Sequence, residues 1–305
     1  MADDNHDSGT QTSPNIFSQP LSIFGMPVDR ETIFANHKGA YKNRVEKRQR
    51  KLIVKTTFIK SFLHDNERIR CLTTGYSPIS ILEQLITGLA FLIFKRARFI
   101  FTDQRLLHIP TRVNGSPAGS ISQILYDDCA KMWLKGRQLM VRYKNGTMER
   151  FPYIGRREKK KVRSLIEDLP LRPKEAGGLN ARMHLCPGCA TPLKSAASSC
   201  PSCEMRYKSP LRARLWAILL PGGGYFYNRY VIPGILVGLV ELMAMGFLIH
   251  QWRAFVQSTP LDSRLLFAVT AGFVVEKFMM AYHAGLLTSV GMPASKDFDV
   301  AMRKA

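Results

Sequence analysis

The sequence predicts a multidomain α+β membrane protein: an antiparallel, barrel-like β domain with a C-terminal helix, a small four-cysteine module, and a C-terminal α-helical transmembrane region. Three observations predict it. Short alternating runs separated by turn residues occupy 97–155, four cysteines lie within 186–203, and long apolar segments follow residue 211. Such patterns are typical of strands, of a metal-binding module and of membrane spans, respectively.

Charge divides the chain in the same way. The 305 residues carry 44 Lys and Arg against 23 Asp and Glu. Residues 211–305 hold nine of the basic and five of the acidic residues, which leaves 35 against 18 and a net charge of +17 for residues 1–210. This balance excludes a uniform soluble globule and indicates polyanionic partners, either phospholipid headgroups or nucleic acid.

The first 62 residues divide into a polar part and a basic part. Residues 1–30 are polar and lack the apolar core of a secretory signal, so we expect a disordered tail. Residues 31–62 predict a basic helix with nine Lys or Arg between 38 and 60. The candidates for contact with an anionic surface are Lys47, Arg48, Arg50, Lys51 and Lys55. Two alternatives stay open: the helix lies on anionic phospholipid headgroups, or its apolar residues pack on the next domain.

Residues 63–170 predict an antiparallel sheet followed by a helix. After a polar turn, the apolar run 79–94 predicts a helix of about 24 Å, too short to cross a bilayer, which either packs on a sheet or dips into the membrane interface. Asn-Gly pairs and Lys135-Gly136 separate the later runs. The predicted strands are 98–102, 105–110, 121–126, 131–135, 138–144 and 147–153, and an amphipathic helix ends near Leu169.

This order of elements resembles the bacterial pleckstrin-homology-like domains over about 63–170. The segment from Phe99 to Leu107 carries the similarity, since an apolar strand runs into Thr102-Asp103-Gln104-Arg105 and a second apolar strand. The family fold serves lipid-binding, peptide-binding and scaffolding roles, so the resemblance alone does not decide among them.

After a linker at 171–183, two Cys-x2-Cys turns stand ten residues apart. They contribute Cys186, Cys189, Cys200 and Cys203, the four thiolates that tetrahedral Zn²⁺ prefers, and residues 184–208 resemble the short zinc ribbons. Two disulfides and an iron–sulfur site are the alternatives, and His184 is a spare ligand that a four-thiolate site does not need. Such a site has no open coordination position, so we expect structural zinc.

Residues 211–292 predict the transmembrane helices. Residues 232–252 and 265–291 are each long and apolar enough to cross a bilayer, whereas 215–227 is interrupted by Pro221 and three glycines. The stretch from Leu219 to Leu236 weakly resembles a family of paired-transmembrane-helix domains. We expect three helical segments, of which two or three span, and a tail at 293–305.

Small and ionisable residues within the predicted spans indicate close helix packing. They are Gly234, Gly238, Glu241, Glu276 and Lys277. A proton or ion path is the alternative, but a neutralised contact such as Glu241 against Lys277 fits a chain with so few spans better.

The sequence carries no recognised enzymatic motif, so we expect a non-enzymatic, membrane-anchored binding or scaffold protein. The resemblances imply a place in the bacterial inner membrane with the soluble domains facing the cytoplasm. Expected partners are the membrane, anionic phospholipid headgroups, and a protein partner or a second copy. A membrane-tethered nucleic-acid-binding protein and a small transport or channel subunit are the alternatives.

Overall fold

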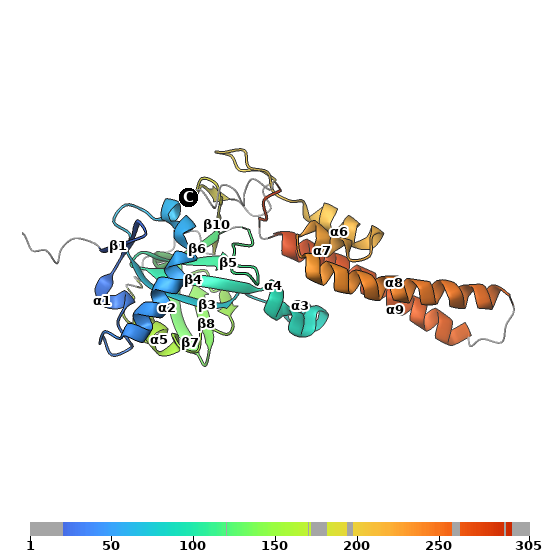
Figure 1. Ribbon diagram of the computed structural model, residues 1–305, viewed down its shortest axis with the longest axis horizontal. Helices are drawn as coiled ribbons and strands as arrows, with labels where there is room; N and C mark the ends of the chain where they lie inside the picture. The colour runs from blue at the N-terminus through green and yellow to red at the C-terminus, as the bar shows by residue number, and fades with distance from the viewer. Residues whose placement is uncertain are drawn as a thin grey trace, which may run out of the picture.

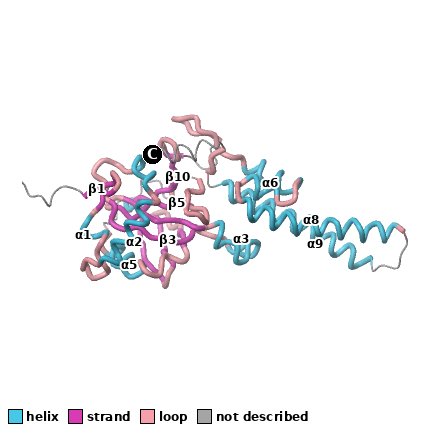
Figure 2. Tube along the Cα trace, viewed as in Figure 1, coloured by secondary structure: helices cyan, strands magenta, loops and turns pink. Residues whose placement is uncertain are grey.

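The computed structural model describes residues 21–119, 121–169, 171, 182–193, 198–257, 263–289 and 291–294 of the chain. The molecule is elongated: a β-rich region forms one end, and a hairpin of two long helices projects from the other (Figure 1). Strands gather in the first part and helices dominate the second (Figure 2). The fold is therefore mixed, with sheets and apolar helices in separate regions, as the sequence predicts.

The β-rich region contains two sheets. The larger has the order β1-β2-β3-β4-β5-β6-β10-β11, and the smaller the order β7-β8-β9. The bounds are β1 Leu21–Ile23, β2 Met26–Val28, β3 Ile69–Tyr76, β4 Arg96–Thr102, β5 Arg105–Pro110, β6 Ile121–Leu125, β7 Cys129–Lys135, β8 Gln138–Tyr143, β9 Met148–Phe151, β10 Met183–Leu185 and β11 Pro192–Leu193. Pairing is antiparallel except between β2 and β3. No barrel is closed among the described residues, because the 3-10 turn Tyr126–Asp128 separates the sheets.

The larger sheet is buried on both faces. Phe99 and Phe101 of β4 face a core shared with the smaller sheet and with helix α5 (Lys159–Glu167). Ile100, between them, faces the opposite core, under helix α2 (Asn43–Val54). Because successive strand residues point to opposite faces, an unbroken apolar run fills both cores.

The turn between β4 and β5 explains the Thr-Asp-x-Arg motif. The Thr102 hydroxyl accepts hydrogen bonds from the amides of Gln104 and Arg105, at 3.2 and 2.9 Å. The Arg105 guanidinium is buried and donates to both carboxylate oxygens of Glu67, at 3.0 and 2.7 Å. This clamp joins the turn to the chain that enters β3.

The start of the chain corrects the expectation of a disordered tail over residues 1–30. Residues 21–28 form the hairpin β1–β2, and Val28 pairs in parallel with Ile69. Met26 and Val28 are buried in the core under α2. The parallel pairing of β2 with β3 joins residues about forty positions apart, so it has no local sequence signal. The hairpin itself is local, but its strands are only three residues long and were not predicted. Residues 1–20 lie outside the described part of the chain.

The segment 31–62 is helical only in part. Helix α1 (Arg30–Ile33) and helix α2 are separated by an irregular stretch, and a 3-10 helix, Thr57–Phe62, follows. The short run 79–94 is likewise broken: helix α3 (Ile81–Thr87) ends at Gly88, whose φ is 51°, and helix α4 (Phe91–Phe94) follows. Helix α5 occupies the end of the predicted sheet domain, as expected.

The four-cysteine ribbon is joined to both halves of the molecule. Strand β10 begins at Met183, inside the predicted linker, and extends the larger sheet by pairing with β6. At the other end of the ribbon, Tyr207 forms a bridge with Pro293, and Lys208 N donates to Met292 O at 2.8 Å. Pro293 and Ala294 therefore belong to the fold, whereas residues 295–305 of the predicted tail lie outside the described part.

The helical region contains two helices of membrane-spanning length, α8 (Val231–Val256) and α9 (Ser263–Ser289). Both are apolar and long enough to cross a bilayer. The first predicted segment instead forms the short helices α6 (Pro210–Leu219) and α7 (Gly223–Tyr227), which pack beside the base of the hairpin (Figure 1). Ten helical residues rise about 15 Å, half of a bilayer core, so α6 does not span.

Candidate metal centre and basic cleft

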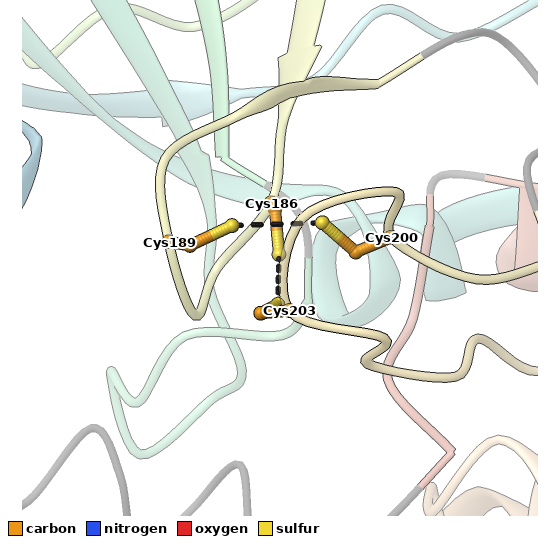
Figure 3. Close-up of side chains that lie close together, drawn as sticks. All are labelled: Cys186, Cys189, Cys200 and Cys203. Carbon is orange, nitrogen blue, oxygen red and sulfur yellow. Dashed lines mark hydrogen bonds between the residues drawn. The ribbon is translucent and has the colours of Figure 1, made fainter.

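Four cysteine thiols meet in the ribbon. Their Sγ atoms lie within 4.8 Å of one another, and both the Cys186–Cys203 and Cys189–Cys200 distances are 3.5 Å. Figure 3 shows the four side chains converging on a common centre. Four sulfurs about 2.3 Å from a central ion would stand about 3.8 Å apart in a tetrahedron. The cluster could therefore hold a metal ion such as zinc, and His184 is not part of it.

The two Cys-x2-Cys turns have the same local geometry. Ala190 N donates to Cys186 O at 2.9 Å, and Glu204 N donates to Cys200 O at 3.1 Å. Ala190 and Glu204, each following the second cysteine of its turn, have left-handed φ values of 57° and 56°. This conformation folds each turn back so that both of its thiols point the same way. Gly188 N also donates to Cys186 Sγ at 3.4 Å, a contact that stabilises a metal-bound thiolate.

One thiol of the cluster, that of Cys189, differs from the two isolated ones, whereas burial raises the pKa of Cys186 and of Cys203. Burial raises the pKa of Cys71 to about 11 and that of Cys129 to about 12. At Cys189 burial acts in the same direction, but hydrogen bonds from Thr191 and the neighbouring thiols outweigh it and lower the pKa to about 6. Cys71 and Cys129 are thus buried, unreactive side chains, whereas the cluster contains a thiol that readily becomes the thiolate that a metal needs.

Helix α2 packs on the larger sheet through its apolar side. Val45, Gln49 and Ile53 are buried, and the Gln49 side chain exchanges two hydrogen bonds of 2.9 Å with the backbone of Leu72. Of the two alternatives for this helix, the geometry supports packing on the next domain, because these side chains are not free to enter a membrane. Figure 1 also shows α2 on the part of the β-rich region farther from the hairpin than α3.

The basic residues of α2 form an outward-facing charged surface. Lys47, Lys51 and Lys55 are exposed and have no ion-pair partner among the described residues. Two arginines have carboxylate partners: Arg48 lies 3.3 Å from Glu158, and Arg50 lies 2.7 Å from Glu46. Three of the five predicted residues are therefore available for an anionic partner, without an apolar face beside them.

Three ionisable residues of the hairpin, Glu241, Glu276 and Lys277, lie together where the α6–α7 turn packs on it. Lys277 Nζ lies 2.6 Å from Glu241 Oε2, the contact that the sequence suggests. The same carboxylate oxygen accepts a hydrogen bond from Gly222 N at 2.9 Å. Glu276 stands one residue from Lys277, and its Oε2 is buried without a hydrogen-bond partner among the described residues. Lys277 thus neutralises the Glu241 carboxylate, and the contacts of Glu241 with Lys277 and Gly222 join α8 to α9 and to the α6–α7 turn.

The glycine pair of α8 packs against this turn within the same chain. A Cβ at Gly234 would come 2.8 Å from the Phe226 ring, and one at Gly238 would come 3.2 Å from Pro221 O. Both glycines are buried. Their role is to let the α6–α7 turn approach α8, so this pair is not a free surface for a second copy of the chain.

A strongly basic cleft lies on the β-rich region where β3, β4 and the loops after β5 and β9 meet. Its volume is about 550 Å³, within the range of small-ligand sites. Six arginines line it, namely Arg96, Arg98, Arg112, Arg137, Arg156 and Arg157. Lys55, at the end of α2, and one carboxylate, Glu158, complete the charged lining. We call this site the basic cleft.

Arg98 forms the buried part of the basic cleft. Its side chain is buried, and its guanidinium donates to the carbonyl oxygens of Lys55 and Gly115, both at 2.6 Å. No carboxylate lies within ion-pairing distance of it in the described ranges. Burial without a counter-ion lowers the pKa of Arg98. A buried cation of this kind favours a bound anion.

The sequence did not predict the basic cleft. Its cationic residues are distributed from 55 to 157, on several strands and loops, and no two of the arginines except Arg156 and Arg157 are adjacent. The continuous charge run of α2 is the stronger sequence signal, yet its exposed lysines lie on the outer face of one helix and do not enclose a cleft. Only the folding of β3 against β4 and the loop at Gly115 brings the cleft residues together.

Comparison with protein-family models, curated proteins and solved structures finds no match to the chain. The ribbon, the hairpin and the basic cleft are therefore the features of the chain that bear on its function.

Proposed function

We propose that this chain is a non-enzymatic, membrane-anchored binding or scaffold protein, whose pleckstrin-homology-like region binds an anionic lipid surface or a protein partner. The observation that carries the proposal is the direct connection of a strongly basic β-rich region to a two-helix apolar hairpin. Large apolar side chains such as Leu236, Met243 and Phe278 are exposed along that hairpin, so it is suited to a lipid environment.

The ribbon carries structural zinc in this proposal. A closed set of four thiolates leaves no position for a substrate, and the binding energy of the metal stabilises a module with little apolar core. Because β10 extends the sheet while Tyr207 contacts Pro293, the ribbon supports the junction between the β-rich region and the hairpin.

We place the β-rich region in the cytoplasm, at the inner membrane of a bacterium. Positive charge favours the cytoplasmic side of a span. Five basic residues precede the hairpin on the side of the β-rich region, whereas Arg253 and Arg264 flank its far end. The five are Arg206, Lys208, Arg212, Arg214 and Arg229. Residues 292–294, after α9, return to the ribbon, which precedes α8. The start of α8 and the end of α9 therefore lie in the same compartment. A reporter enzyme fused after Ala305 should be cytoplasmic, and external activity would contradict this topology.

The anionic partner is tested with the full chain held in neutral phosphatidylcholine nanodiscs. We expect it to bind phosphatidylglycerol vesicles at low salt and to release them at high salt, because exposed charges are screened. The variant Lys47→Gln/Arg50→Gln/Lys51→Gln should weaken binding several-fold. A matched control, Lys131→Gln/Arg142→Gln/Lys144→Gln, changes the charge equally on the smaller sheet. If the protein ignores the vesicles but shifts RNA or duplex DNA at equal phosphate concentration, the nucleic-acid alternative replaces this proposal.

A further inference from the structure

Helices α3 and α4 present an apolar surface that no described part of the chain covers. Ile81, Leu85 and Leu89 are 82, 75 and 80 % exposed, and Leu82 is also exposed. Side chains of this size are seldom gathered in the open on a soluble protein, and a rimmed patch of this kind marks an interaction surface.

This apolar surface is fixed in position next to the hairpin. Glu83 is buried, pairs with Lys95 at 2.7 Å, and lies 3.8 Å from Nε2 of His283 in α9. Phe94 stacks on Tyr225 of α7, with ring centroids 5.3 Å apart. In Figure 1, α3 lies on the side of the β-rich region from which the hairpin projects. The patch is therefore held near the level at which the hairpin would enter a bilayer.

The basic cleft adjoins the same surface. Phe91 of α4 packs on two residues of the cleft wall, Tyr76 and Tyr153, with ring centroids 6.0 and 6.2 Å apart. Arg96, another cleft residue, donates from Nε to the carbonyl oxygen of Leu92 in α4, at 3.2 Å. An apolar surface and a cationic cleft thus share one wall, which is the pattern of an amphiphile-binding site.

The charge of the basic cleft is not neutralised by the protein. Its single carboxylate, Glu158, is engaged by Arg48 at 3.3 Å, outside the cleft lining. Arg98 is bound by carbonyl oxygens and has no carboxylate partner in the described ranges. Guanidinium groups match phosphate oxygens through paired hydrogen bonds, and six of them here surround a volume of about 550 Å³.

We propose that the basic cleft binds the phosphate-bearing headgroup of an anionic membrane lipid, while α3 and α4 lie in the apolar layer beside the lipid's acyl chains. The proposal rests on the membrane anchoring proposed above. It commits to a lipid as the source of the phosphate, because a soluble phosphate would leave the exposed side chains of Ile81, Leu85 and Leu89 without a partner. An extended nucleic acid would need several open aromatic rings to stack on, whereas in this cleft Tyr76 and Tyr153 pack on Phe91 and only Tyr153 is exposed, at 47 %.

The test measures lipid retention by the full chain in mild detergent, using native mass spectrometry with added dioleoyl phosphatidic acid, phosphatidylglycerol or phosphatidylcholine. The variant Arg112→Gln/Arg156→Gln/Arg157→Gln removes one half-buried and two exposed cleft charges and leaves buried Arg98 in place. We expect at least a tenfold loss of affinity for the anionic lipids. The matched control, Arg142→Gln/Arg150→Gln/Lys160→Gln, changes exposed charges elsewhere and should alter affinity less than twofold. Equal effects of both variants would overturn the proposal.

Two further arms identify the source of the phosphate. Glycerol 3-phosphate and inorganic pyrophosphate should bind at least tenfold more weakly than phosphatidic acid. The variant Leu85→Ser/Leu89→Ser should weaken lipid binding and leave glycerol 3-phosphate binding unchanged. If the soluble phosphates bind as tightly as the lipid, or if a short RNA does, the lipid assignment is wrong. Binding of the soluble phosphates needs no bilayer, so it tests the basic cleft alone. The reporter fusion after Ala305 tests the membrane topology alone. A failure of the cleft to bind phosphate can therefore be told apart from a failure of the proposed membrane anchoring.

Discussion

The β-rich region and the helical region each contain a buried ion pair, Arg105–Glu67 and Lys277–Glu241, and the two pairs differ in how many hydrogen bonds satisfy the cation. In the β-rich region, Arg105 donates to both oxygens of Glu67 and to Phe62 O at 2.5 Å, so its planar group is almost fully satisfied. In the helical region, Lys277 makes one close contact with Glu241, at 2.6 Å, and a longer one of 3.4 Å with a backbone carbonyl. The first pair is a clamp between segments of one core, and the second is a single contact between helices.

The two ion pairs also differ in the packing of the apolar side chains around them. The β-rich region encloses two apolar cores that contain its large aromatic and branched residues. Where α6 meets α9 in the helical region, the buried contacts are made by small residues, Ala213, Ala217, Ala281 and Ala284, while large side chains such as Leu236, Met243 and Phe278 are exposed along the hairpin. The first region is stabilised by apolar burial, whereas the second is held by close backbone packing between helices whose outer faces are apolar.

Loss of the metal should have the largest effect on stability. It tests whether unfolding of the ribbon, which lies between the two regions, also destabilises the β-rich region. We expect the purified chain to contain one zinc per molecule, and Cys189→Ser to reduce this below a tenth. Structural zinc sites have apparent binding free energies of about 10–16 kcal/mol, so the ribbon should unfold. Hydrogen exchange should rise over residues 183–208 while β3, β4 and β5 stay protected. Arg206→Gln, which keeps all four thiols, is the control, and full zinc in the Cys189 variant would refute the site.

Removing the clamp should strongly destabilise the β-rich region. Arg105→Leu leaves the buried Glu67 carboxylate without a partner, a change that costs about 3–5 kcal/mol in free energy of unfolding. Denaturant unfolding of the full chain in detergent, followed by hydrogen exchange of β4 and β5, measures it. Arg142→Leu, on the exposed side of β8, should change stability little. A loss below 1 kcal/mol at Arg105 would show that the clamp is not structural.

Close packing in the helical region is tested at Gly222. Its φ is +67°, and a Cβ there would come 2.1 Å from Gly234 O. Gly222→Ala should therefore destabilise the region by about 2–4 kcal/mol, through strain and overpacking. The control is Gly246→Ala, since a Cβ at Gly246 meets nothing within 4 Å. Thermal unfolding in detergent compares them, and equal melting temperatures would contradict the packing argument.

Loss of the Glu241–Lys277 pair should have the smallest effect. Lys277→Met removes one close contact between α8 and α9, so we expect a loss of about 1–2 kcal/mol in free energy of unfolding. The double variant Lys277→Met/Glu241→Gln should restore part of it, because no unpaired charge remains. Thermal unfolding of the two variants measures the difference. If Lys277→Met lowered the free energy of unfolding as much as Arg105→Leu does, the two ion pairs would not differ in their contribution to stability.

Local patterns predicted much of the β-rich region. The expected strand 105–110 coincides with β5, and the strands 121–126 and 138–144 each exceed β6 and β8 by one residue at their ends. Alternating residues between turn signals carry this information. Strands β1, β2 and β3 were missed because β2 and β3 pair in parallel across a long separation, and β1 and β2 have only three residues each.

By itself, the sequence determined those features whose physics is local along the chain. The spacing of Cys186, Cys189, Cys200 and Cys203 places four thiols on two adjoining turns, and the length and hydropathy of α8 and α9 suit a membrane. Only the tertiary structure decided that Lys55 meets Arg98 and Arg157 in one cleft, that α2 turns its apolar side inward, and that the α6–α7 turn covers the glycines of α8. These contacts join residues far apart in sequence, and their geometry depends on how the sheets and helices pack together.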